Sequence, residues 1–278
     1  MSYFNSLTRH YIVLLSWILL PILTISFAHG QGLSVSPSRI LFKGEPGETV
    51  TQAITFVNNS KNEFNFTSGI KDWDRDSTGT KRYFPVGQIK DSNGKWIQLS
   101  AGSFGLKPGE TKEVNLSLII PKNDTSKRLT HSMVFFTQVK EQMKRKPNQA
   151  EVGVNVLIEV GVQVYHVPVG LPAGDLEFLA FVDKGISGNS KTGIRKMAVK
   201  VKNSGQINKD AYVRFELTNK DTGEEIPIKS IAIAMLPGAE QWVNLDLPAN
   251  LKGNYLAVAI LDAGSQYDLK VAEKEVTY

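Results

Sequence analysis

The fold of this 278-residue chain is decided by residues 152–168, which read VGVNVLIEVGVQVYHVP. β-Branched residues fill every second position over thirteen residues: Val152, Val154, Val156, Ile158, Val160, Val162 and Val164. A period of two is that of a β-strand, so these side chains should all share one face. At ~3.3 Å per residue such a strand would extend about 40 Å, which is longer than usual. It should end at Pro168, because proline cannot donate a hydrogen bond to a sheet.

Short strands separated by turn residues are predicted on both sides of this stretch. Alternating apolar residues at 114–120 are typical of a half-buried antiparallel strand, and the same style continues after Gly170, with turns such as Asp221-Thr222-Gly223 and Pro237-Gly238. Strands spaced by about 8–12 residues with such turns indicate β-sandwiches. The predicted fold class is therefore all-β, with two consecutive immunoglobulin-like β-sandwich domains at 31–170 and 171–278.

The first thirty residues are predicted to be a signal peptide rather than part of the fold. Arg9 precedes an apolar run at 12–27, and Ala28-His29-Gly30 has small residues at the two positions that a signal peptidase reads. Cleavage is expected near Gly30. The rival interpretation is an uncleaved anchor, but the run has 16 residues and contains Pro21, whereas a span needs about 20 apolar residues. No second long apolar run follows, so the mature chain should not insert stably into a membrane.

Composition and motifs argue against an enzyme and against nucleic-acid binding. The formal charge of +5 falls to +4 without the leader, which is mild for this length. The chain has no cysteine, so disulfides, thiol nucleophiles and cysteine-ligated metals are excluded. His131 and His166, the histidines of the predicted mature chain, belong to no catalytic or metal-ligand pattern. No cofactor is predicted.

A run of aspartates at 72–79 has some of the spacing of a calcium-binding loop. Asp72, Asp74 and Asp76 fit the pattern, but Ser77 stands where it has glycine and Tyr83 where it has a bidentate glutamate. An acidic turn between strands is the preferred interpretation, and a weak calcium site remains the alternative.

Five segments in order resemble the N-terminal domain of PapD-like periplasmic pilus chaperones. They are SVSPSRILF (34–42), FTSGIKDWDRDSTG (66–79), FGLKPGETKEVNLSL (104–118), HSMVFFTQV (131–139) and the stretch at 152–168. The resemblance implies a periplasmic protein that donates a β-strand to protein subunits of fimbriae or other envelope assemblies. It leaves open an outer-membrane usher as a second partner.

The resemblance also implies which residues bind the subunit. Alternate side chains of the long strand would fill the subunit's groove: Val154, Val156, Ile158, Val160, Val162 and Val164. The simple alternative is that this row points into its own sandwich. Arg39 matches an arginine that anchors the subunit's terminal carboxylate, but Gln163 stands where the family has a lysine. Glutamine can donate a hydrogen bond but brings no charge.

Two other functions fit an all-β exported chain. A structural or adhesive cell-envelope protein could use the two domains as spacers, because fold does not determine function. An enzyme or a carbohydrate-binding module could use Trp73, Trp96 or Trp242 at a sugar site, although tryptophan in sandwiches is more often part of the core.

Overall fold

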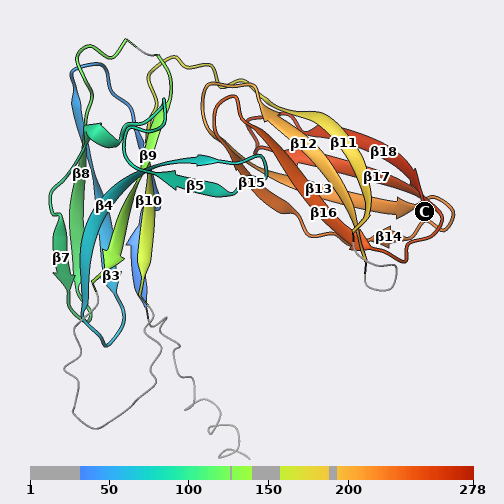
Figure 1. Ribbon diagram of the computed structural model, residues 1–278, viewed down its shortest axis with the longest axis horizontal. Coiled ribbons are helices and arrows are strands. Elements are labelled where there is room, and N and C mark those ends of the chain that lie inside the picture. The colour runs from blue at the N-terminus through green and yellow to red at the C-terminus, as the bar shows by residue number, and fades with distance from the viewer. Residues whose placement is uncertain (1–31, 126, 140–156, 188–192) are drawn as a thin grey trace, which may run out of the picture.

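The computed structural model describes residues 32–125, 127–139, 157–187 and 193–278, and these residues form β-strands almost throughout (Figure 1). The strands form two sandwiches that lie at an angle, so that the molecule is bent. The predicted all-β fold with two consecutive sandwiches is confirmed. The predicted signal peptide lies outside the described residues. No helix within the described ranges has the length and apolar character of a membrane span.

The first sandwich packs a sheet of four strands against a sheet of six. The first sheet has the order β1 (Leu33–Ser36), β3 (Thr49–Asn58), β8 (Thr111–Ile119) and β6 (Ile97–Leu99), and the 3-10 turn η2 (Gly94–Trp96) precedes β6. The second sheet has the order β2 (Arg39–Phe42), β10 (Glu159–His166), β9 (Thr130–Gln138), β4 (Phe64–Arg75) and β5 (Lys81–Phe84), with β7 (Ser103–Leu106) also beside β4.

The core of this sandwich follows from alternation along its strands. Val114, Leu116 and Leu118 of β8 are fully buried, as their period of two predicts. They share the inner face of their sheet with Phe56 of β3, whose ring lies 4.8 Å from that of Phe136 in the facing sheet, centroid to centroid, in an edge-on contact. Such aromatic pairs add to the stability that apolar burial supplies.

The second sandwich has the same construction. Its smaller sheet has the order β11 (Leu176–Ser187), β12 (Ile194–Asn203) and β16 (Glu240–Pro248). Its larger sheet has the order β14 (Glu225–Ile226), β13 (Lys209–Asn219), β17 (Asn254–Asp262) and β18 (Lys270–Thr277), with β15 (Ile231–Met235) also beside β13. Alternate residues of β12 and β13, such as Val199 and Phe215, form a core separate from that of the first sandwich.

The two sandwiches meet along the outer face of the sheet that contains β10. Trp73, Met133 and Tyr165 are buried there in a third apolar cluster, which Leu236 of the second sandwich joins. The β4–β5 hairpin extends beyond its own sheet toward the second sandwich (Figure 1). At its tip the carbonyl of Ser77 accepts a hydrogen bond of 2.7 Å from the amide of Trp242 in β16. An apolar cluster and a backbone hydrogen bond therefore both join the two sandwiches.

Candidate partner-binding strand and interdomain cleft

Strand β10 has one edge that is paired along only half its length. Strand β9 pairs with it from Glu159 to His166, whereas β2 pairs with it only from Gln163 onward. Strand β2 starts at Arg39 because the chain before Pro37 runs in the opposite sheet, as β1. Within the described part of the chain, no strand covers the β2 side of residues 159–162.

The backbone groups at this open edge can be identified from the neighbouring hydrogen bonds. The carbonyl of Ile158 accepts a bond of 2.8 Å from Gln138 of β9, and the amide of Gln163 donates one of 3.0 Å to Ser38 on the β2 side. Backbone groups of successive strand residues point to opposite edges. Those of Glu159 and Gly161 therefore point to the open edge, where an added strand could bond to them.

The side chains of the predicted row do not share one environment. Val162 and Val164 have no exposed surface and belong to the core of their own sandwich, so neither is available to a partner in this structure. The reason is their parity, which turns both toward the facing sheet. Ile158 is partly buried against the core, and Val160 is half-buried. Val152, Val154 and Val156 lie outside the described residues.

Arg39 and Gln163 lie directly opposite each other on β2 and β10. Both are on the outer face of the sheet, together with Tyr165, whose hydroxyl donates a hydrogen bond of 2.8 Å to Oε1 of Gln163. Burial raises the pKa of Tyr165 to about 12, so it remains a donor at neutral pH. The guanidinium of Arg39 lies 5.8 Å from the centroid of the Tyr165 ring, in cation–π geometry.

The partner of Arg39 belongs to the second sandwich. Its Nη1 and Nη2 lie 2.5 and 3.2 Å from the two carboxylate oxygens of Asp210 in β13. This is a bidentate pair, the geometry in which a guanidinium binds a carboxylate most strongly. Arg39 can therefore bind a carboxylate at the angle between the two sandwiches, which we call the cleft, and in this structure it does so.

Two further cations come from the β4–β5 hairpin. Arg75 and Lys81 lie 5.5 and 5.4 Å from the centroid of the Trp73 ring. Burial lowers the pKa of both side chains, and repulsion from Arg75 and Arg39 lowers that of Lys81 further. Among the described residues, neither has an ion-pair partner.

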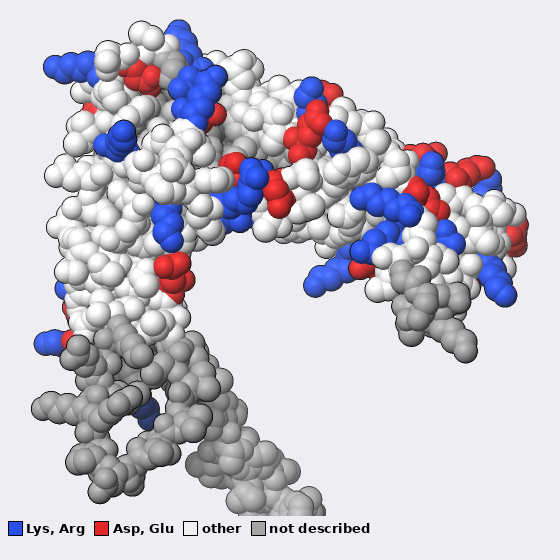
Figure 2. Space-filling view, viewed as in Figure 1, with Lys and Arg blue, Asp and Glu red and all other residues white. Residues whose placement is uncertain are grey.

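We call Arg39, Arg75, Lys81, Gln163, Tyr165 and Asp210 the cleft cluster. Figure 2 shows basic side chains, with acidic ones beside them, at the inner bend where the two sandwiches meet. The cluster combines three cations with one carboxylate, and its positive surplus favours binding of an anion. The sequence pattern pointed to Arg39 and Gln163 but not to Arg75, Lys81 or Asp210.

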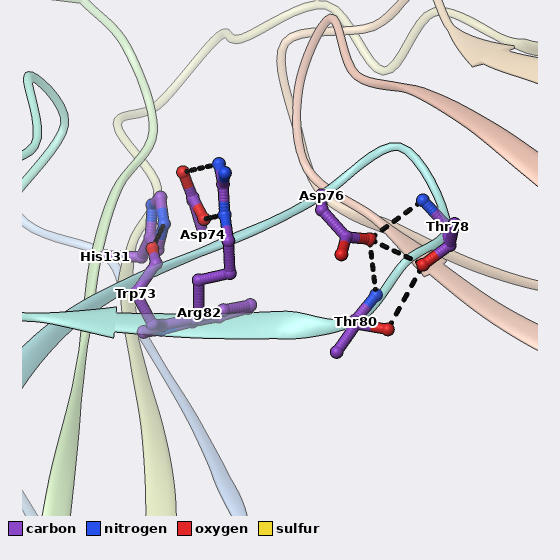
Figure 3. Close-up of polar contacts among 7 residues, drawn as sticks. All are labelled: Trp73, Asp74, Asp76, Thr78, Thr80, Arg82 and His131. Carbon is purple, nitrogen blue, oxygen red and sulfur yellow. Dashed lines mark hydrogen bonds and ion pairs between the residues drawn. The ribbon is translucent and has the colours of Figure 1, made fainter.

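The aspartates of the 72–79 run have separate partners, and Figure 3 shows those of Asp74 and Asp76. Asp74 accepts bonds of 2.8 and 2.7 Å from Arg82, and Asp76 accepts bonds from Thr78 and Thr80 within its own turn. Asp72 is buried and faces the loop at 87–92. In the part of the chain that the structure describes, no group of three acidic, histidine or cysteine side chains could hold a metal ion. The acidic-turn interpretation is therefore preferred over the calcium site.

The two histidines, together with Trp73 and Trp96, are buried or pack against the core of the first sandwich. His131 and His166 are buried, and Nε2 of each lies within hydrogen-bond distance of a backbone carbonyl, at 2.8 Å from Trp73 and 3.0 Å from Gly44 (Figure 3 for His131). Trp73 is fully buried and so cannot line a sugar site, and Trp96 packs against the core.

Several solved structures resemble this chain along most of their length. A chain of the chaperone–tip adhesin complex of CFA/I fimbriae biogenesis is 12% identical, with a TM-score of 0.46, over 87% of this chain and 98% of that chain. A chain of the CsuC–CsuE pre-assembly complex from Acinetobacter baumannii Csu pili is 11% identical, with a TM-score of 0.48, over 87% and 97%. The E. coli chaperone DraB is 15% identical, with a TM-score of 0.44, over 88% and 98%. No protein-family model and no curated protein matches the chain.

Proposed function

We propose that this protein is a periplasmic chaperone that binds subunits of fimbriae or other envelope assemblies through the open edge of β10. The observation that supports the proposal is the open edge of β10. Residues 163–166 of this strand are paired on both edges, whereas residues 159–162 are paired only with β9. The ordered sequence motifs at 34–168 favour the same function. Capture by strand addition needs neither a catalytic group nor a cofactor.

An incoming strand would gain both main-chain and side-chain contacts at this edge. Glu159 and Gly161 direct their amides and carbonyls outward, so they can extend the sheet by one strand. Ile158 and Val160 keep part of their surface free for a groove in the subunit. Full burial of an aliphatic side chain contributes about 1.5–3 kcal/mol; because both side chains are already partly buried, completing their burial should contribute up to about 1 kcal/mol each.

The cleft cluster would hold the end of the captured chain. Arg39 offers a forked donor for a terminal carboxylate, and Gln163 beside it can donate a hydrogen bond. Gln163 brings no charge, but Arg75 and Lys81 supply positive charge on the same side of the cleft. The departure from the family's lysine is thereby compensated by residues of another hairpin.

The proposal is tested by co-expression with candidate subunits, followed by isolation of one-to-one complexes. The variant Val160→Thr, alone and with Ile158→Thr, should reduce capture strongly while the circular dichroism spectrum and the urea midpoint stay near those of the parent. Ile119→Thr is the matched control, since Ile119 is an exposed β-branched residue on the opposite sheet. If the double variant captures subunits as well as the control does, strand donation is the wrong mechanism and a spacer function becomes the better account.

A further inference from the structure

The partner of Arg39 is a carboxylate of the same chain, although the sequence separates the two residues by 171 positions. The pair bridges the two sandwiches, since Arg39 lies in β2 and Asp210 in β13. Both guanidinium nitrogens that a carboxylate would use are occupied by Asp210. The site that the proposed function assigns to a client carboxylate is therefore already filled.

We infer that Asp210 is an internal competitor, which occupies the client carboxylate's place on Arg39 until a client displaces it. This inference rests on the proposed function and adds a means of regulating the same site. When a client displaces Asp210, one carboxylate replaces another on the Arg39 guanidinium. The client can therefore form the same hydrogen bonds to Arg39 that Asp210 gives up.

The exposure of the pair allows such an exchange. The side chain of Asp210 is 54% exposed and that of Arg39 29%, so water and a ligand can reach the contact. Ion pairs of this exposure are weak, because solvent screens them and ordering both side chains costs entropy. A pair sealed in the protein interior could not act in this way, since opening it would leave a buried charge without a partner.

The charges around the pair also favour a second carboxylate. Arg75 and Lys81 have no ion-pair partner in the described ranges, and both lie close enough to Arg39 for its charge to affect their pKa. Asp210 balances only part of this positive charge. A client carboxylate would reduce the repulsion among the three cations, whereas Asp210 alone leaves two of them uncompensated.

The position of Asp210 is held by its neighbour in β13. Lys209 is buried, and its Nζ lies 3.4 Å from the centroid of the Tyr267 ring. Because Lys209 points into the second sandwich, Asp210 points outward toward the cleft. The competitor is thus presented by a fixed strand rather than by a loop.

The test uses the purified full chain and acetate as the carboxylate probe, with acetamide as its uncharged counterpart. Binding is followed by the NMR shifts of the Arg39 and Gln163 backbone amides. Asp210→Asn should bind acetate at least about threefold more tightly than the parent, the gain expected when an exposed ion pair no longer competes. Asp175→Asn is the control, since Asp175 is an exposed carboxylate of the second sandwich that pairs with Lys270 at 2.9 Å.

Arg39→Ala, measured in the same way, separates the failure of this inference from that of the proposed site. If Arg39→Ala abolishes acetate binding but Asp210→Asn binds no better than the parent, Asp210 is not a competitor and the carboxylate site at Arg39 stands. If Arg39→Ala binds acetate as the parent does, Arg39 is not a carboxylate site, and both the inference and that part of the proposed function are wrong.

Discussion

Replacing Asp72 by alanine should destabilise the first sandwich far more than any other change in the acidic run. The Asp72 side chain is fully buried at the end of β4 that leads into the hairpin. Its Oδ2 accepts bonds from the amides of Gly87, Gln88 and Ile89 at 2.7, 3.0 and 3.3 Å, and its Oδ1 accepts one of 2.6 Å from the hydroxyl of Ser92. One carboxylate therefore holds the whole loop at 87–92.

The magnitude follows from these four contacts. A hydrogen bond to a charged group contributes about 1.5–3 kcal/mol, and a buried donor left without a partner costs about 1–3 kcal/mol. Water entering the space left by the carboxylate would satisfy some of the donors. A net loss of about 3–5 kcal/mol in the free energy of unfolding is expected, which is at the upper end for a single substitution.

The assay is urea unfolding followed by tryptophan fluorescence at neutral pH. Asp74→Ala is the matched control, because Asp74 lies two residues away in the same strand but forms an exposed ion pair with Arg82. The loss in the free energy of unfolding should be much smaller for Asp74→Ala than for Asp72→Ala. Equal losses in the two variants would refute the reasoning. So would a clear rise in the stability of the parent on adding calcium, because binding to the folded state alone would then reveal a metal site.

Two further changes test other parts of the structure. Burial lowers the pKa of His131, so the unfolded chain binds a proton at a higher pH than the folded chain does. The free energy of unfolding should therefore fall as the pH drops below about 6.5, and His131→Gln should reduce this slope; an unchanged slope would contradict the assignment. Gly79→Val should loosen the hairpin tip against β16, because Gly79 has a φ of +87°, which strains valine, and an added Cβ would lie 2.3 Å from the side-chain Nε2 of Gln241 and force that side chain to move. Hydrogen exchange at the Trp242 amide should then accelerate, whereas Gly109→Val, with positive φ but open space around it, should leave that amide protected.

Alternation along the sequence was sufficient to predict the fold and the inward face of the strands. The residues at 114–120 are buried as their period requires. Strand β18 was not predicted, because apolar residues do not mark its inward face: two of the residues on that face are lysines, and a valine lies on the outward face. Val271 is exposed, whereas Lys270 and Lys274 are half-buried on the face toward the core. A strand of this kind is recognised only from its pairing with β17.

The candidate site was predictable only in part, because its defining features are contacts between distant segments. The resemblance selected Arg39 and Gln163 as residues of one site, and the structure places the two opposite each other on β2 and β10. It could not show that the partner of Arg39 is Asp210. The spacing of Asp72 and Asp74 left a weak calcium site as the alternative to an acidic turn, and spacing alone does not reveal that each carboxylate faces different donors.

The division of β10 into two halves explains how one strand can both build a core and bind a partner. Val162 and Val164 are sealed in the sandwich, and pairing on both edges holds that half extended. The other half is paired with β9 on one edge only, so its second edge can stay open. An open edge also risks pairing with copies of itself, and a charged residue at the edge opposes this. Glu159 has that position, held by a bond of 2.8 Å from Thr137, so two identical edges would bring like charges together, whereas a subunit strand without an opposing carboxylate would be accepted.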